Sequence, residues 1–314
     1  MDQKGFSLLE TLISQPLKQF LANNELPKTY LGWAHSNFSP IVHTIIENHK
    51  RDPRKTQIIG INGSQGSGKS TLASYLCTVI ADKLNIQTIA LSLDDFYLTK
   101  SSRKELAKTT HKLLETRGVP GTHDTALAIS TIESLLKGEK TVITRFDKSR
   151  DDRFDESDLL TTSGNFGFIV IEGWCFGAKP QSQVEINRPI NDLEKNADPE
   201  GVYRNYVNKC LAEEYQSLFA MVDYLVMLKA PSFSCVFKWR LEQENKLRDR
   251  IARSDSDDIS ASGIMSEIEI NEFIQYFQRI TEVCISEMPS RADFLYELNE
   301  HRDIKSQYSK VKDI

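Results

Sequence analysis

Apolar residues along the chain fall into two patterns, short continuous runs and longer stretches with helical spacing. The continuous runs predict buried strands, because a strand covered on both faces needs apolar side chains at successive positions. These strands are expected at residues 57–61, 88–93, 141–143, 168–171, 224–228 and 294–298. Apolar residues three or four positions apart predict helices, which are expected at residues 71–84, 124–136, 202–219, 234–251 and 266–288. Strands that alternate with helices indicate an α/β fold with a mostly parallel sheet flanked by helices.

The first fifty residues are also predicted to be helical. An apolar pattern with helical spacing begins at Phe6 and continues beyond Pro16. A second helix is expected at residues 41–46, because Ser39 and Pro40 form a suitable N-cap and first-turn pair.

Polar segments divide the chain. Residues 48–55 are polar and basic, which predicts a linker between a helical extension at residues 1–55 and a larger domain at residues 56–314. Within that domain, residues 187–200 read as a surface loop, and the Ser- and Asp-rich residues 254–262 as a mobile segment.

The charge balance argues against a nucleic-acid partner. The 314 residues carry 39 Lys and Arg against 44 Asp and Glu, a net charge of -5, whereas nucleic-acid binding needs a clustered basic face. No apolar run approaches the roughly 18 residues of a membrane-spanning helix, and the first residues lack the layout of a signal peptide. The five cysteines are scattered without a C-x-x-C pair, which favours reduced thiols over a zinc site or disulfides. We therefore expect a cytoplasmic protein without nucleic-acid or membrane partners.

The strongest chemical motif is Gly63-Ser64-Gln65-Gly66-Ser67-Gly68-Lys69-Ser70, which fits the phosphate-loop pattern G-x-x-x-x-G-K-[ST]. A predicted strand runs into the motif, and a predicted helix leaves it at Thr71. Its glycines let backbone N–H groups approach phosphate oxygens, and the helix points its positive end at the same anion. Lys69 is expected to reach the terminal phosphates, and the Ser70 hydroxyl to hold Mg²⁺. The whole segment, including Thr71, is therefore the expected ATP site of a P-loop NTPase fold.

Other phosphate-loop classes fit less well. A GTPase should carry N-K-x-D, and residues 208–211 lack its Asp. No predicted strand ends in the paired Asp-Glu of many ATP-driven motors, since the strand at residues 168–171 ends in Glu172-Gly173. A small-molecule kinase is the class that remains.

Carboxylates stand at the ends of two predicted strands. Ligands of a parallel sheet bind outside the carboxyl ends of its strands. Asp94 is placed there to orient or deprotonate an acceptor hydroxyl, or to bind Mg²⁺ through water, and Glu172 ends its own strand in the same way. For Asp95, helix capping is an equally ordinary role.

Together with the loop, Asp94-Asp95-Phe96-Tyr97 and Glu172-Gly173 resemble the phosphoribulokinase, uridine kinase and pantothenate kinase superfamily. Three further segments resemble the plant and fungal type of glycerate 3-kinase: R-G-x-P-G-T-H-D at residues 117–124, F-D-K-S at 146–149 with Asp152-Arg153 after it, and W-R-x-x-Q-E at 239–244. The resemblance extends from about residue 57 to the C-terminus, although the family's Gly- and Arg-rich stretch after F-D-K-S is here shorter in glycine.

The resemblance implies ATP- and Mg²⁺-dependent phosphorylation of a small hydroxy acid, D-glycerate to 3-phosphoglycerate. A carboxylate substrate with hydroxyls needs cationic forks and polar partners. The expected substrate-binding residues are Asp94, Tyr97, Arg117, Thr122, His123, Asp124, Lys148 and Arg153. The expected catalytic residues are Lys69, Asp94, Glu172 and Arg240, and the expected metal-binding residues are Ser70, Asp94 and Glu172. Arg240 would belong to a lid helix and neutralise charge on the transferring phosphate, and the resemblance sets residues 299–302 near the adenine.

Two alternatives remain open. The acceptor is another hydroxyl compound, such as pantothenate or a nucleoside, although the R-G-x-P-G-T-H-D segment argues against this. Alternatively, the chain is a nucleotide-binding regulator or ATPase whose interaction surfaces are the N-terminal helices and residues 254–262. Such a protein has no need of acids at two strand ends together with a cationic lid. For His123 and Asp124, the simpler role is capping of the helix that follows.

Overall fold

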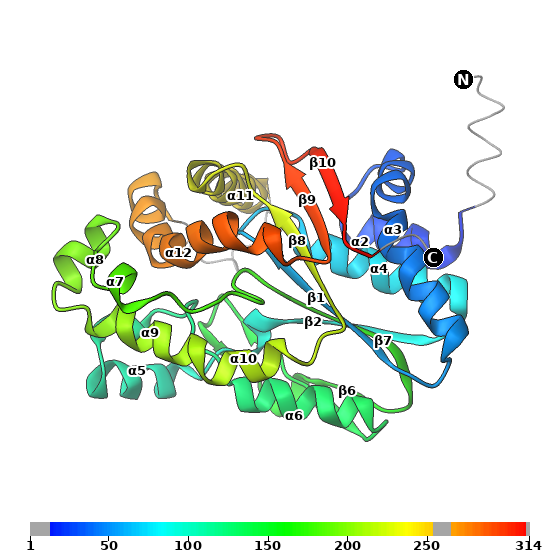
Figure 1. Ribbon diagram of the computed structural model, residues 1–314, viewed down its shortest axis with the longest axis horizontal. Coiled ribbons are helices and arrows are strands. Elements are labelled where there is room, and N and C mark those ends of the chain that lie inside the picture. Colours follow the sequence, from blue (N-terminus) through cyan, green and yellow to red (C-terminus); the bar gives the residue numbers. More distant parts are fainter. Residues whose placement is uncertain (1–12, 254–264, 312–314) are drawn as a thin grey trace.

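Six strands form the central sheet of the protein, and five of them run parallel. The strands are β1 (Gln57–Gly63), β2 (Gln87–Ser92), β7 (Phe166–Gly173), β8 (Tyr224–Lys229), β9 (Phe294–Leu298) and β10 (Ile304–Ser309). The computed structural model describes residues 13–253 and 265–311, and its sheet has the order β10-β9-β8-β1-β7-β2 (Figure 1). β10 is antiparallel to β9 and forms one edge. The expected α/β class with a mostly parallel sheet is confirmed.

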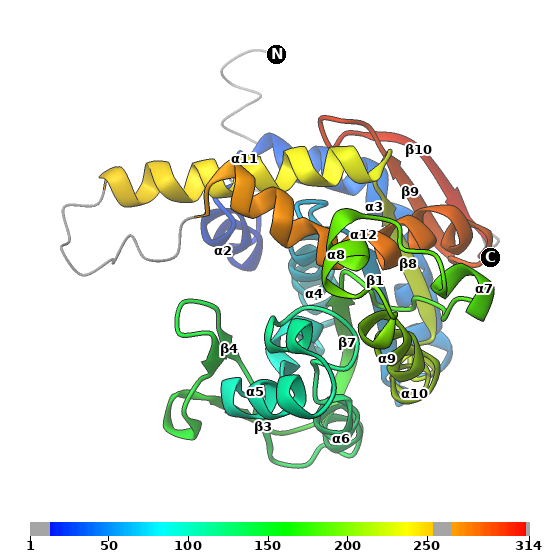
Figure 2. The same cartoon turned by 90° about the vertical axis from the view of Figure 1, so that its left-hand side faces the viewer.

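Helices cover both faces of this sheet. Their bounds are α2 (Gln15–Asn23), α3 (Thr29–Arg51), α4 (Lys69–Leu84), α5 (Lys100–Thr109), α6 (Thr125–Leu136), α7 (Gln183–Ile186), α8 (Asp192–Ala197), α9 (Val202–Ala212), α10 (Glu214–Phe219), α11 (Phe233–Arg253) and α12 (Glu267–Glu287). α4 packs against β1, β2 and β7, and α2 and α3 pack on α4. α9 and α10 lie on the other side of the sheet from α4 (Figure 2). α11 and α12 pack on each other.

β1 lies inside the sheet and is buried along its whole length. It pairs in parallel with β7 and β8, so that Ile59 lies opposite Val170 on one side and Tyr224 on the other. Gly60 fits this strand because a Cβ there would lie 2.2 Å from a ring carbon of Phe176. Because β7 and β8 hold β1 on both sides, the phosphate-loop motif that follows β1 lies at the carboxyl edge of the sheet. Parallel sheets bind their ligands at this edge.

The helix expected to start at Ser39 and Pro40 starts earlier, so that prediction was wrong. α3 begins at Thr29 and carries Pro40 in its interior. A proline inside a helix loses one backbone hydrogen bond and crowds the preceding turn. The flanking side chains offset this cost, because Phe38 and Ile41 are both almost fully buried. α3 then continues to Arg51, so the first half of the expected linker is helical.

The described part of the N-terminal extension, residues 13–55, shares the main hydrophobic core. The ring of Phe38 meets Tyr296 of β9 at a centroid distance of 5.0 Å, and Phe20 lies 5.9 Å from Tyr75 of α4. These helices therefore act as a covering layer of the sheet. The apolar pattern that begins at Phe6 lies largely outside the described residues.

Two expected elements have a different form. Residues 202–219 make two helices, because the chain turns at Glu213, where φ is −102° and ψ is −87°. The expected surface loop at residues 187–200 contains α8, whose N-cap Asn191 accepts a hydrogen bond from the backbone N–H of Glu194.

Strand expectations also change. The strand at residues 141–143 exists as β3 (Thr141–Ile143), but it pairs with β6 (Leu160–Thr162) outside the central sheet. A second small hairpin joins β4 (Phe146–Asp147) to β5 (Asp152–Arg153). β9, expected to be the last strand, is followed by β10. The expected mobile segment at residues 254–262 lies outside the described residues.

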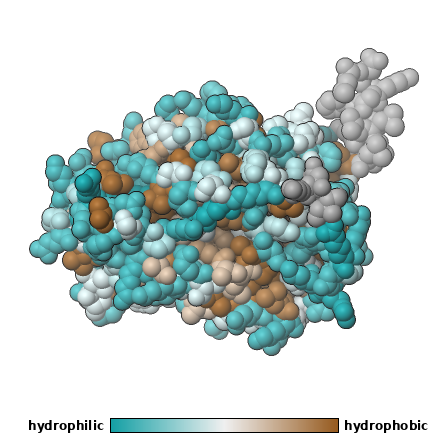
Figure 3. Space-filling model, viewed as in Figure 1, coloured by the Kyte–Doolittle hydropathy of each residue, from teal (hydrophilic) through white to brown (hydrophobic). Residues whose placement is uncertain are grey.

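Hydrophilic residues predominate on the face of the molecule in Figure 3, and hydrophobic ones gather there in smaller groups. The apolar side chains of the interior form one connected cluster that includes residues from β1, β7 and α4. Among the described residues, we find no helix with the length and apolar character that a bilayer crossing requires.

Candidate active site

The phosphate-loop motif connects β1 directly to α4. β1 ends at Gly63 and α4 begins at Lys69. Gly66 and Gly68 have φ angles of +78° and +90°, in the left-handed region that favours glycine. Gly63 is needed for another reason, because a Cβ there would lie 2.4 Å from the hydroxyl of Ser67. The sequence thus forms a tight loop around the N-terminus of α4.

Polar atoms inside the loop lack protein partners, which suits an anionic ligand. The hydroxyls of Ser64 and Ser67 are buried and make no hydrogen bond to any described residue. Since an unpaired buried polar group is costly, such atoms mark places where a bound group supplies the bond. The first backbone N–H groups of α4 face the same place and add the positive end of the helix dipole. The loop is therefore shaped for phosphate.

Glu172, at the end of β7, meets the first turn of α4. The Ser70 hydroxyl donates to Oε1 of Glu172 at 2.7 Å. Oε2 of Glu172 is buried without a hydrogen bond to a described residue, and it lies 4.0 Å from Nζ of Lys69. A hydroxyl and carboxylate oxygens are the hard donors that Mg²⁺ prefers, so Ser70 and Glu172 fit this ion. Among the described residues, no group of three or more His, Cys, Asp or Glu is placed to hold a metal ion.

Asp94 stands beside the loop, in the short 3₁₀ turn that follows β2. The Tyr97 hydroxyl donates to its Oδ1 at 2.9 Å, and Lys148 donates to its Oδ2 at 2.8 Å. Burial raises the pKa of the Asp94 carboxyl, but the charges of Lys148 and Lys69 outweigh burial and hold this pKa below its usual range. Asp94 is therefore an ionised hydrogen-bond acceptor at neutral pH. Burial and the nearby Asp94 charge raise the pKa of Tyr97 well above its usual value, so Tyr97 keeps its proton.

A cavity of about 330 Å³ joins the phosphate loop to Asp94. Its lining comes from the phosphate loop, from α11 and α12, from the segment after β2 and from the turn of the β4–β5 hairpin. Four cations and one carboxylate in its lining favour an anionic ligand. The lining residues are Gln65, Gly66, Lys69, Ser70, Asp94, Tyr97, Arg117, Lys148, Trp174, Arg240, Gln243, Phe273 and Phe277.

Two arginines expected from the sequence lie in the cavity wall with fixed partners. Arg117 pairs with Asp151, and its guanidinium lies 5.5 Å from the centre of the Phe146 ring. Arg240, on α11, lies 2.7 Å from Oε2 of the buried Glu244. Each pair holds its cation in one orientation, which limits the entropy lost when an anion binds.

Thr122, Asp124 and Arg153 lie outside the cavity lining drawn from the described residues. The Thr122 side chain is fully buried and donates to the carbonyl of Val119 at 2.7 Å. Asp124 caps α6, as the simpler reading of the sequence had it, and also pairs with Arg153 at 3.1 Å. Arg153 further donates to the carbonyl of Tyr97. The structure assigns these residues to shaping the backbone behind Tyr97.

His123 supports the site from behind Tyr97. The two rings stack with their centroids 4.4 Å apart. Nδ1 of His123 lies 2.6 Å from the Tyr215 hydroxyl, which also accepts the backbone N–H of Gly121. Burial lowers the pKa of His123 to about 4, against the opposing charge of Asp94. His123 is therefore a neutral buried ring that holds Tyr97, and through it Asp94.

An aromatic wall of the cavity was missed by the sequence analysis. Trp174, Phe273 and Phe277 line it. The Trp174 indole N–H donates to the carbonyl of Gly118 at 2.9 Å, and its ring lies 5.0 Å from that of Phe277. No local signal marks these residues, because aromatic side chains after a buried strand or on an amphipathic helix are ordinary core positions.

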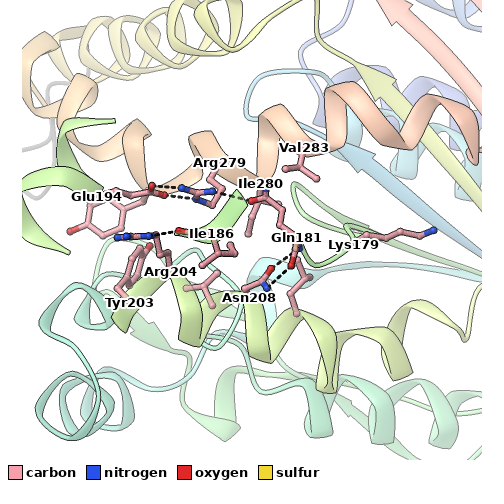
Figure 4. Close-up of a pocket in the computed structure, with 13 residues that line it drawn as sticks. Lys179, Gln181, Ile186, Glu194, Tyr203, Arg204, Asn208, Arg279, Ile280 and Val283 are labelled. Carbon is pink, nitrogen blue, oxygen red and sulfur yellow. Dashed lines mark hydrogen bonds and ion pairs between the residues drawn. The ribbon is translucent and has the colours of Figure 1, made fainter. Parts of the chain in front are cut away.

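A second cavity, close to α7, α9 and α12, has a structural role. Figure 4 shows the carboxylate of Glu194 paired with the guanidinium of Arg279, and Arg204 bonded to the carbonyl of Ile186. Arg204 also pairs with the buried Asp198 at 3.0 Å. The volume of about 20 Å³ has room for about one water molecule. The ion pairs around this cavity hold the surrounding helices together, and the cavity is too small for a metabolite.

The parallel sheet, the phosphate loop and the carboxylates of Asp94 and Glu172 beside it define a P-loop kinase. Solved structures share the fold. A D-glycerate 3-kinase from Cryptococcus neoformans superposes with a TM-score of 0.68 over 85% of this chain and 96% of its own, at 22% identity. The YGR205w protein gives 0.68 over 86% and 95%, also at 22% identity.

Sequence comparison identifies the family. The kinase mug58 of Schizosaccharomyces pombe, described as uncharacterized, is 34% identical over 255 residues, which cover 77% of this chain and 87% of that protein. The chloroplastic D-glycerate 3-kinase of Arabidopsis thaliana is 32% identical over 230 residues, 70% of this chain and 46% of the plant protein. No protein-family model matches the chain. The chain belongs to a family of P-loop kinases that includes mug58, and it is an ATP-dependent phosphotransferase.

Proposed function

We propose that the protein transfers the γ-phosphoryl group of ATP to the 3-hydroxyl of D-glycerate, yielding 3-phosphoglycerate and ADP. The observation that carries the proposal is the position of Asp94, whose ionised carboxylate faces the same cavity as Lys69 of the phosphate loop. A carboxylate beside the transferring phosphate can orient an acceptor hydroxyl and take its proton.

The cavity chemistry supports a small anionic acceptor. Arg117 and Lys148 line it on the side of Asp94, and their charges suit the carboxylate of glycerate. Lys148 is well exposed and sits in the turn of the β4–β5 hairpin, so it can turn from Asp94 to a bound carboxylate. The rigid aromatic wall at Trp174 and Phe277 limits the room left beside the γ-phosphate, which favours glycerate over a nucleoside.

The transfer would proceed in line. The loop N–H groups and Lys69 hold the phosphates, while Asp94 accepts a hydrogen bond from the 3-hydroxyl. The hydroxyl oxygen bonds to the γ-phosphorus as the bond from that phosphorus to the bridging oxygen of ADP breaks, and the hydroxyl proton passes to Asp94. Lys69 and Arg240 neutralise the charge on the transferring group and on the leaving oxygen.

Mg²⁺ is the metal proposed for this site. Ser70 would hold it directly and Glu172 through a bound water, and the ion would supply neutralisation of the phosphate oxygens. Asp94 is occupied by Tyr97 and Lys148, so we assign it to the acceptor side.

Relatives give independent support for the acceptor. The plant protein that shares 32% identity with this chain is named a D-glycerate 3-kinase. The match spans 230 residues, 70% of this chain. We carry the substrate over as part of the proposal because the cavity residues suit it.

The test is ADP release from MgATP with D-glycerate, L-glycerate, pantothenate and uridine as acceptors. We expect turnover with D-glycerate to exceed that with each other compound by at least about tenfold, the discrimination that one or two lost polar contacts produce. Phosphorus NMR of the product should place the phosphate on C3. A higher rate with pantothenate or uridine would overturn the acceptor, and slow hydrolysis that no hydroxyl compound accelerates would favour a nucleotide-dependent regulator.

A matched pair of variants tests the role of Asp94. Asp94→Asn should lower kcat roughly 10²- to 10⁴-fold. Asp95→Asn changes the adjacent residue, whose Oδ1 accepts the backbone N–H of Phe146, a bond that an amide oxygen can also accept. It should therefore keep most of the activity. Equal activity of the two variants would remove Asp94 from the reaction.

A further inference from the structure

Arg302, in the turn between β9 and β10, reaches into the phosphate loop. Its Nε donates to the carbonyl of Gly66 at 2.9 Å. Its guanidinium lies 5.3 Å from the centre of the Trp239 ring, and its Nη2 lies 2.5 Å from a carboxylate oxygen of Glu242. One side chain thus contacts both the loop and α11, which carries Trp239 and Glu242.

Trp239 joins the same three elements from the side of α11. Its indole N–H donates to the carbonyl of Glu300 at 2.7 Å, in the turn that also carries Arg302. A Cβ at Gly66 would lie 2.8 Å from Cβ of Trp239, so the loop backbone packs directly on this residue. The phosphate loop, α11 and the β9–β10 turn therefore meet at one point.

Both ends of the peptide unit between Gly66 and Ser67 are held. Its carbonyl accepts from Arg302, and its N–H donates to the carbonyl of Ser64 at 3.1 Å. The peptide unit is planar, so fixing its carbonyl also fixes the direction of its N–H. A glycine before such a unit allows it to flip at low cost. The Arg302 contact opposes this flip.

The backbone at Arg302 carries strain that the contacts must offset. Its φ is +72°, a region that costs a non-glycine residue free energy and that persists where the surroundings hold it. A turn residue without a role would relieve this strain as glycine. Glycine would relieve the strain but would lose the contacts of the Arg302 side chain, which indicates that these contacts have a role.

We propose that Arg302 is a positioning residue for phosphoryl transfer, which holds the phosphate loop in its binding shape and fixes α11 against it. Arg240 follows Trp239 on α11, so the same contact sets the distance between the loop and the cation that faces the transferring phosphate. The proposal needs the ATP-dependent kinase activity and is independent of which acceptor is used.

The test uses the full chain and the variant Arg302→Gly, because glycine suits the backbone angle and removes only the side chain. Titration with a fluorescent N-methylanthraniloyl ATP should give roughly 10- to 100-fold weaker binding, the loss expected for a hydrogen bond from a charged donor. In kinetics, KM for ATP should rise and kcat should fall, while KM for the acceptor stays unchanged. Arg302→Lys keeps the charge but loses the planar fork. Its affinity for the ATP analogue should lie between those of the unchanged protein and Arg302→Gly.

Two comparisons separate positioning from plain stability. Lys305→Ala removes an exposed cation just beyond the turn and should bind the ATP analogue like the unchanged protein. Thermal unfolding of Arg302→Gly should remain close to that of the unchanged protein, since relief of strain offsets lost contacts. Unaltered affinity and kcat in Arg302→Gly would overturn the proposal, as would a fall in thermal stability with ATP binding unchanged in the folded protein.

Discussion

The hydroxyl of Ser70 donates a 2.7 Å hydrogen bond to Oε1 of Glu172, although 102 positions separate the two residues. β1 and β7 are parallel neighbours in the sheet, so the loop after β1 and the carboxylate that ends β7 emerge side by side. The bond joins the helix that receives the phosphates to the second proposed metal-binding group. A substitution at Glu172 should therefore alter the phosphate site through Ser70.

Glu172→Gln should raise the Mg²⁺ concentration needed for half-maximal activity and lower kcat roughly 10- to 100-fold. Glutamine keeps the shape and can still accept from Ser70, but it removes the charge that would hold the metal-bound water. The measurement is ADP release against Mg²⁺ concentration at fixed ATP. Glu133→Gln, on the exposed side of α6, is the control, and an identical Mg²⁺ curve for both variants would contradict the assignment.

Lys69→Ala should lower kcat/KM at least about 100-fold and leave the fold intact. The only ion pair we find for Lys69 among the described residues is the 4.0 Å approach to Glu172, so the side chain contributes little to folding. Urea unfolding should change by no more than about 0.5 kcal/mol. Lys83→Ala, at an exposed position of the same helix, should retain full activity. Activity of Lys69→Ala near the unchanged level would remove the lysine from the phosphate site.

The pH profile should move when Lys148 loses its charge. Burial favours the neutral form of Asp94, and Lys148 and Lys69 together reverse that effect and lower its pKa. In the unchanged protein, Asp94 therefore takes up a proton only at a pH below the ordinary Asp pKa of about 3.9. Lys148→Ala removes one opposing charge, so the pKa rises and the acid limb of kcat/KM moves to higher pH.

The control for that prediction is Lys148→Arg, which keeps a cation beside Asp94. Its acid limb should stay where it is in the unchanged protein, even if substrate affinity falls. The position of the limb, rather than the height of the profile, carries the result. An unmoved limb in Lys148→Ala would mean that Asp94 is not the group whose ionisation activity requires.

Two glycine substitutions should have opposite effects on stability. Gly60→Ala places a Cβ 2.2 Å from the ring of Phe176 in the buried β1, and overpacking of this kind costs about 1–3 kcal/mol. Gly32 lies in α3 with nothing within 4 Å of an added Cβ, so Gly32→Ala should stabilise by roughly 0.5–1 kcal/mol. Denaturant midpoints measure both, and a destabilised Gly32→Ala would contradict the helical environment.

The sequence located the phosphate site well for a physical reason. The residues of the loop are contiguous, and their spacing depends on the backbone geometry that a phosphate requires. Asp94 and Glu172 could also be placed, because each follows a continuous apolar run whose carboxyl end must lie at the same edge of the sheet. The structure brings Lys69, Ser70, Asp94 and Glu172 together as this reasoning expected.

Other residues could not be placed from pattern alone. Thr122 and Arg153 were expected at the substrate, whereas their donors serve backbone carbonyls. A side chain that binds a ligand and one that binds its own backbone need the same polar atoms, so residue type cannot separate them. Trp174 was missed for the converse reason, since an apolar side chain in a cavity wall looks like one in the core.

Two elements show why parts of the fold could not be predicted, each for a different reason. β10 is an edge strand with mostly exposed residues, and strand periodicity is visible only where one face is buried. The helix expected at residues 41–46 is shorter than α3 (Thr29–Arg51) because proline is common at a helix start and Pro40 therefore predicted one. Burial of Phe38 and Ile41 on both sides of the proline is a tertiary effect that no local window contains.

Arg302 meets the carbonyl of Gly66 across 236 positions of the chain. During synthesis, β1, the phosphate loop and α4 leave the ribosome long before the β9–β10 turn that carries Arg302. A growing chain therefore displays its nucleotide-binding motif for most of its translation without the contact that closes the loop from behind. The carbonyl of Gly66 therefore gains its Arg302 partner only after β9 and the turn that follows it have been made.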